Sequence, residues 1–213
     1  RVPRRYRGKD VYEWMYLSGF LSRTPDKLPS PQAKFGANPH VSGKDGGRTL
    51  NLHQFARDGV VLLGRIRNGR GDTIWLANDL KENLKKSDQV EVDIVKMIDD
   101  YITRAGLQAP PQVLPVLRDG YEAEEVSELN LRTAGITSII WAIGYDFNFS
   151  FVKLPVFDTD GYPLQNRGVT AAPGLYFVGL PWLHNQKSGH LSGVGEDAEF
   201  IAAAIAHDQD GKR

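Results

Sequence analysis

The sequence predicts an α/β fold, and two stretches carry this prediction. Residues 175–178 (LYFV) form a short apolar, β-rich run typical of a buried strand, and Gly179 ends it. A glycine-rich loop follows, after which apolar residues recur at helical spacing over 198–205. Residues 136–142 (ITSIIWA) are a second β-branched run and are expected to form another buried strand. Strand, loop and helix therefore follow one another as in an α/β sheet.

Composition limits the class of protein. The chain has 213 residues, 41% of them hydrophobic, which suffices for one large domain or two small ones. Its 26 basic and 26 acidic side chains cancel, so net charge gives no sign of a nucleic-acid partner. It has no cysteine, which excludes disulfides and thiolate chemistry and fits a cytoplasmic location. No apolar run approaches the roughly 18 residues that a membrane span needs, and the first residues do not predict a signal peptide.

The glycine-rich loop after residue 178 is the candidate binding site. Glycine allows backbone to approach a ligand closely, and a helix N-terminus offers free N–H groups to an anion or a polar ring. An ordinary turn between strand and helix needs glycine as well, so the pattern alone leaves both interpretations open. Gly193, Gly195 and Ala198 match G-x-G-x-x-A, but a long loop separates them from the strand and two acidic residues follow Gly195. We therefore do not interpret them as a dinucleotide fingerprint.

Several linked motifs resemble one family. Residues 172–205 resemble the C-terminal flavin segment of flavin-containing-monooxygenase-like FAD/NAD(P)H oxidoreductases, which carry two dinucleotide-binding domains. Residues 139–146 (IIWAIGYD) resemble the "ATGY" signature of that family, with Ile143 in place of its Thr, which removes a hydroxyl. Residues 147–166 are also similar to it. The resemblance covers the second half of the chain and, more weakly, the first.

The resemblance implies a C-terminal portion of a Rossmann-like, two-dinucleotide-binding-domain flavoprotein. It divides the chain into 1–138, the C-terminal part of an NAD(P)-binding domain with a helical insertion, and 139–213, the C-terminal segment of an FAD-binding domain. The chain begins with Arg1 and lacks both glycine fingerprints in their strand–turn–helix setting, so we expect it to be part of a longer protein. On this basis it starts just after the second strand of the NAD(P) domain.

The implied cofactors are FAD and NADP(H). The residues expected to bind FAD are Gly144, Tyr145, Gly179, Leu180, Trp182, His184, Lys187, Gly189 and Gly193. Lys187, or the N-terminus of the last helix, could stabilise negative charge on the reduced flavin. For His184 and Lys187, ordinary hydrogen bonding within the loop is the alternative.

An arginine cluster at the start of the chain is the candidate NADP site. Arginine pairs bidentately with phosphate, and the resemblance places Arg1, Arg4 and Arg5 near the adenosine 2′-phosphate. A solvated basic arm is the alternative.

The rest of the first half reads as structural. We expect short helices over 10–20 and 50–58, a hairpin with strands 60–66 and 73–76, and a long amphipathic helix over 79–105. His53 is expected to be a solvated or satisfied residue rather than a catalyst, although it could face a domain interface. No metal site is expected, because the acidic residues lack a ligand-loop spacing.

Two functions follow from these observations. The first is an FAD-dependent NAD(P)H oxidoreductase of monooxygenase type that acts on a small-molecule substrate, with no nucleic-acid or membrane partner. The second is a non-catalytic remnant or interaction module that has lost cofactor binding. No Ser-His-Asp or Cys-His set supports a hydrolase. The sequence identifies neither catalytic residues nor the oligomeric state.

Overall fold

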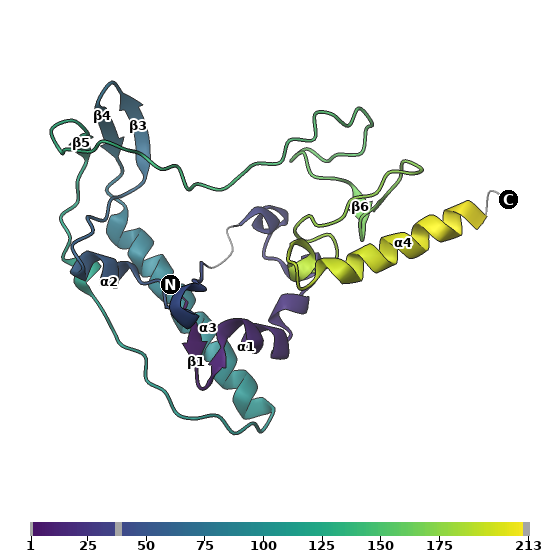
Figure 1. Ribbon diagram of the computed structural model, residues 1–213, viewed down its shortest axis with the longest axis horizontal. Helices are drawn as coiled ribbons and strands as arrows, with labels where there is room; N and C mark the ends of the chain where they lie inside the picture. The colour runs from purple at the N-terminus through teal and green to yellow at the C-terminus, as the bar shows by residue number, and fades with distance from the viewer. Residues whose placement is uncertain (1, 37–39, 211–213) are drawn as a thin grey trace. The chain divides into compact units, whose positions relative to one another are not determined.

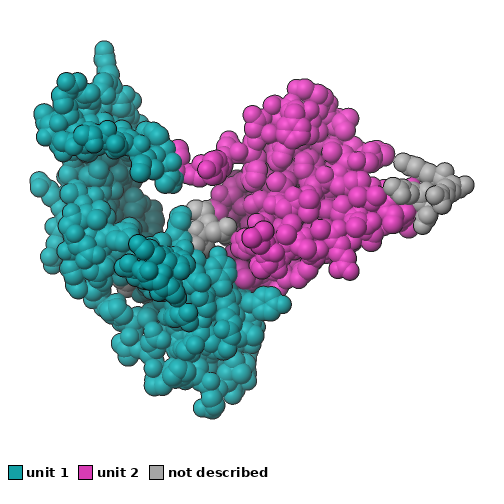
Figure 2. All heavy atoms as spheres, in the orientation of Figure 1, with its two compact units in different colours: residues 1–18, 38–142 teal, residues 19–37, 143–213 magenta. Residues whose placement is uncertain are grey.

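The computed structural model describes residues 2–36 and 40–210. The chain forms two compact units, residues 1–18 with 38–142 and residues 19–37 with 143–213 (Figure 2). These units are defined by packing, whereas the predicted domains 1–138 and 139–213 were defined by cofactor, so that division stays a prediction. Each unit is described by itself.

The longest helix of unit 1 is α3 (Leu80–Arg104), and it confirms the expected helix over 79–105. Its inner face carries one stripe of buried residues, which are Leu80, Leu84, Glu91, Ile94, Ile98 and Ile102. Val90, an apolar residue of the same helix, lies off this stripe and is 41% exposed. Seven residues after Leu84 the same face returns at Glu91, because two turns of an α-helix take about seven residues.

A small hairpin and a short helix pack near the C-terminal half of α3. Strands β1 (Arg5–Tyr6) and β2 (Lys9–Asp10) lead into α1 (Val11–Leu17), where the Asp10 carboxylate accepts the N–H of Tyr12 as an N-cap. Trp14 is 1% exposed, and its indole N–H donates to the carbonyl of Tyr6 at 2.7 Å. The ring of Trp14 meets that of Tyr101 edge-on, with centroids 6.4 Å apart. Helix α1 confirms the helix expected over 10–20.

The other end of unit 1 holds a three-stranded antiparallel sheet (Figure 1). Strand β4 (Thr73–Leu76) lies between β3 (Ile66–Arg70) and β5 (Glu128–Asn130). The hairpin expected here therefore exists, but its first strand begins where we expected it to end. Helix α2 (Leu52–Arg57), capped by Asn51, confirms the helix expected over 50–58.

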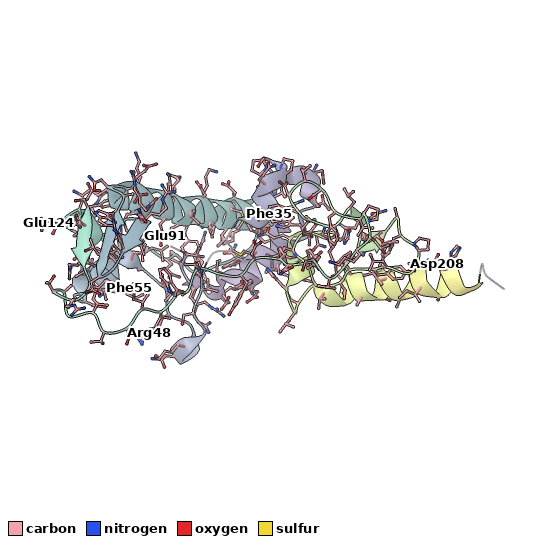
Figure 3. The ribbon with its side chains drawn as sticks, turned by 90° about the horizontal axis from the view of Figure 1, so that it is seen from above. Phe35, Arg48, Phe55, Glu91, Glu124 and Asp208 are labelled. Carbon is pink, nitrogen blue, oxygen red and sulfur yellow. The ribbon has the colours of Figure 1, made fainter. Side chains whose placement is uncertain are left out.

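Unit 2 is built mainly from turns around one helix. Strands β6 (Gln165–Asn166) and β7 (Val169–Thr170) form a short antiparallel hairpin, and α4 (Val194–Asp210) is the predicted last helix (Figure 1). The Tyr176 hydroxyl donates to Asp208 at 2.7 Å. Asp208 is labelled on α4 in Figure 3. Phenylalanine rings stack beside the hairpin, with the centroids of Phe149 and Phe157 5.3 Å apart.

Two strands that we predicted are not formed. In residues 175–178 the structure has one isolated bridge, from Tyr176 to Val169, and residues 136–142 are extended without pairing to a described strand. Ile140 is 89% exposed instead of buried. A strand forms only when a neighbour accepts its backbone hydrogen bonds, and apolar composition does not supply one. The fold is mixed α/β with small antiparallel sheets, and the Rossmann-like arrangement stays a proposal.

Candidate functional site

The loop after residue 178 is the candidate site. Gly179 has φ +80°, a left-handed conformation that suits glycine. Trp182 has φ +61°, which is rare for a bulky residue and costs about 1 kcal/mol or more. Trp182 and Leu183 are both buried, so packing holds this bend in place. The sequence therefore fixes the path of the loop at two successive bends before its polar residues begin.

A capping box fixes the next turn, the 3-10 helix over residues 186–189. The Asn185 side chain accepts the N–H of Lys187 at 3.1 Å, while the Ser188 hydroxyl accepts the N–H groups of Asn185 and His184 at 3.0 Å each. Ser188 is completely buried. The pattern N-x-x-S satisfies the free backbone donors at the start of a helical turn, so it sets the orientation of this loop.

Two glycines bring the loop backbone into close contact with itself. A Cβ on Gly193 would lie 2.3 Å from the Lys187 carbonyl oxygen, and a Cβ on Gly189 would lie 3.2 Å from the Pro181 backbone. The first distance is impossible for a side chain without a shift of backbone. Both glycines were predicted as FAD contacts, and in this structure they serve loop packing; their role toward a ligand stays a prediction.

Lys187 is the buried cation of the loop. Its side chain is 6% exposed, and its ammonium donates to the carboxylate of Glu196 in the first turn of α4. Glu196 is half exposed, so the pair stands at the edge of the packed region. The structure thus places one cation beside a helix N-terminus, where both attract negative charge, although Glu196 already offsets part of it.

A buried carboxylate lies behind this loop. Asp197 is 1% exposed, and neither of its oxygens accepts a hydrogen bond from the described residues. Its nearest basic side chains are His184, whose Nδ1 lies 3.6 Å away, and Arg167, whose Nη2 lies 3.8 Å away. The Arg167 guanidinium also stacks 4.3 Å from the ring of Phe200. An ionised carboxylate is costly to bury, and the Arg167 guanidinium is the permanent cation that stands close enough to offset its charge.

Tyr162 closes the inner side of the site. It is buried, and its hydroxyl donates to the carbonyl of Pro181 at the start of the loop. Burial is the largest cause that raises its pKa, and the carboxylates of Asp158 and Asp197 raise it further. The phenol therefore stays protonated and acts as a hydrogen-bond donor.

Other predicted FAD residues lie in less packed positions. Leu180 is half-buried beside Gly179. Gly144 has φ +86° with open space around it, and the side chain of Tyr145 is fully exposed, so it does not pack on the loop. The structure brings Trp182, His184, Lys187, Gly189 and Gly193 together and leaves Tyr145 apart.

The predicted NADP residues belong to unit 1. Arg1 lies outside the described residues. Arg4 forms an ion pair with Asp10 at 2.7 Å, and Nη2 of Arg5 donates to the carbonyl of Gly46 at 3.2 Å. Arg4 and Arg5 are therefore used within the fold, and binding of a 2′-phosphate stays a prediction.

Sequence reasoning missed the residues that hold the site together. Arg167, Asp197 and Tyr162 were not predicted as site residues, and Asp197 entered only as one of the two acidic residues after Gly195 that argued against a dinucleotide fingerprint. A capping pattern was readable at Asn185 and Ser188, and an acidic residue in a first helical turn is a standard signal for stabilisation of that helix. The pairing of Asp197 with Arg167, 30 residues away, had no local signal.

Comparisons with known proteins give three relatives. The chain is 33% identical over 107 residues to a Geobacillus kaustophilus protein named uncharacterized oxidoreductase CzcO-like, which covers 50% of this chain and 29% of that protein. It is 46% identical over 67 residues to the uncharacterized oxidoreductase CzcO of Bacillus velezensis, covering 31% and 19%, and 43% identical over 70 residues to that of Bacillus subtilis, covering 32% and 20%. The matched parts span less than a third of these relatives. No family model and no solved structure matches.

Among the described residues, no helix has the length and apolarity to cross a bilayer. No group of three potential metal ligands occurs among them either.

Proposed function

We propose that this chain is the C-terminal part of an FAD-dependent NAD(P)H oxidoreductase of monooxygenase type. Its relatives are named oxidoreductases, which supports a redox function at the level of class. The cofactors come from the motif resemblance. The observation that carries the proposal is the loop 179–193, which places a buried cation and a half-exposed imidazole beside the N-terminus of α4.

The residues of this loop fit a flavin. Glycines allow close approach of backbone, and Lys187 with the start of α4 favours negative charge on a ring placed there. When bound, the flavin supplies the redox chemistry, by accepting hydride from NADPH and passing electrons to oxygen or another acceptor. The chain itself positions the ring, and Trp182 and Leu183 exclude water from the base of the loop.

A flavin titration tests the proposal. We expect saturable quenching of FAD fluorescence by a longer form of the protein that contains both glycine fingerprints, and weak or no binding by these 213 residues alone. Lys187→Met should weaken binding in the longer form about tenfold, because a buried charge partner is worth at least ~1.4 kcal/mol. Lys85→Met, which changes an exposed lysine of α3, serves as the control. Absence of saturable binding by the longer form overturns the proposal.

The second candidate is an interaction module without cofactor. The exposed apolar stretch 139–141 of unit 1 favours it, because Ile140 and Trp141 are 89% and 63% exposed and large exposed apolar surfaces mark interaction sites. If the longer form does not bind FAD, this second function takes the place of the first.

A further inference from the structure

His53 joins three elements of unit 1 from a fully buried position. It lies in the first turn of α2 and is 1% exposed. Its Nδ1 accepts the backbone N–H of Gly120 at 3.0 Å, and its Nε2 lies 3.2 Å from Oδ2 of Asp88 on α3. A ring nitrogen that accepts an N–H carries no proton, so the neutral imidazole is protonated at Nε2 and donates to Asp88.

The groups around the imidazole make this junction sensitive to charge. From α3, the Asp88 carboxylate also accepts the Tyr121 hydroxyl at 2.8 Å. From the turn 119–121, the Tyr121 ring lies 4.8 Å from the imidazole, and Asp119 forms a two-point pair with Arg57 of α2 at 2.8 and 2.9 Å. The carboxylate at Nε2 stabilises an imidazolium, whereas the N–H at Nδ1 opposes one.

We propose that His53 is an acid-released clasp between α2 and the turn 119–121. Uptake of one proton from solvent at Nδ1 removes the acceptor for the Gly120 N–H. The new Nδ1–H and the Gly120 N–H then face each other and repel. Asp88 retains the imidazolium on α3, so Gly120 is the contact that breaks. The turn then opens locally at Gly120, whereas the Arg57–Asp119 pair and the Tyr121–Asp88 hydrogen bond still hold its other residues on α2 and α3. This property is independent of flavin binding.

Amide hydrogen exchange of the full 213-residue chain, followed by NMR between about pH 8 and about pH 5.5, tests the clasp. We expect the protection of the Gly120 amide, relative to that of Ile98 in the middle of α3, to fall by up to about tenfold per pH unit once the imidazole titrates. In His53→Asn the amide oxygen takes the place of Nδ1 and cannot be protonated. Protection of Gly120 in that variant should not depend on pH.

Two further measurements keep the proposal falsifiable if His53→Asn fails to fold. The ¹⁵N shifts of the wild-type imidazole at pH near 8 should show the Nε2-protonated tautomer. Asp88→Asn removes the anion that retains the imidazolium, so it should shift the loss of Gly120 protection to lower pH, whereas Asp93→Asn on the exposed face of α3 should not. An Nδ1-protonated tautomer, or Gly120 protection that does not change with pH in the wild type, overturns the clasp.

Discussion

Nη2 of Arg167 lies 3.8 Å from Oδ1 of Asp197, although the two residues are 30 positions apart in the sequence. The Asp197 side chain is 1% exposed. This pair connects the hairpin β6–β7 to the first turn of α4. Breaking a buried ion pair by removal of one partner leaves a buried charge without its counter-ion, which costs about 3 kcal/mol or more. Arg167→Met should therefore destabilise the protein by about 3 kcal/mol in urea unfolding.

The double variant Arg167→Met with Asp197→Asn is the matched control for that experiment. It removes both charges, so it should recover at least half of the lost stability, because the penalty comes from the uncompensated carboxylate. If the double variant is no more stable than Arg167→Met, the guanidinium stabilises the fold through its stacking on Phe200 and not through Asp197.

Gly193 and Gly195 give a second matched pair. A Cβ on Gly193 meets the Lys187 carbonyl, whereas a Cβ on Gly195, in the first turn of α4, has open space. Gly193→Ala should destabilise the protein by about 2 kcal/mol, since overpacking forces backbone to shift. Gly195→Ala should be neutral or stabilise it by up to about 1 kcal/mol through helix propensity. Thermal unfolding of the two variants distinguishes the effects, and equal destabilisation would contradict the packing at Gly193.

The helices of this fold were predictable because their signals are local. Helix α3 repeats its apolar residues every three or four positions, and Asp10 and Asn51 cap α1 and α2. The expected strand 136–142 was wrong for this chain because pairing depends on a partner far away in sequence, which composition does not reveal.

The same distinction holds for the site. That Trp182, His184 and Lys187 share one loop was predictable, since they lie together in sequence, and their role toward a flavin stays a prediction. Arg167 and Tyr162 reach the site only through tertiary packing. No spacing in the sequence predicts that Asp197 lies near them. His53 was expected to be a solvated or satisfied residue, and its burial and its contacts with Gly120 and Asp88 show that it is a satisfied one.

From the environment of Tyr162 we predict that the folded protein loses stability at alkaline pH. Burial raises its folded-state pKa above the usual value of about 10, so its contribution is fully present below about pH 10 and is lost as pH rises above that value. Tyr162→Phe should lose about 1 kcal/mol at neutral pH through the missing hydrogen bond to Pro181, and it should show a smaller further loss in alkali. Urea unfolding at neutral and alkaline pH measures both. An equal alkaline loss in wild type and variant would assign the effect to other groups.

Substitutions of Trp14 and Trp75 show which of the two indoles contributes more to the stability of unit 1. Each donates one hydrogen bond, Trp14 to the Tyr6 carbonyl at 2.7 Å and Trp75 to the Glu128 carboxylate at 3.0 Å. Trp14 is fully buried, so Trp14→Phe leaves a cavity and a buried carbonyl without its donor, and should cost about 3 kcal/mol. Trp75 is partly exposed and water can replace its hydrogen bond, so Trp75→Phe should cost less than about 1 kcal/mol. Urea unfolding followed by far-ultraviolet circular dichroism avoids the change in tryptophan fluorescence, and a larger loss for Trp75→Phe would contradict the placement of the core around Trp14.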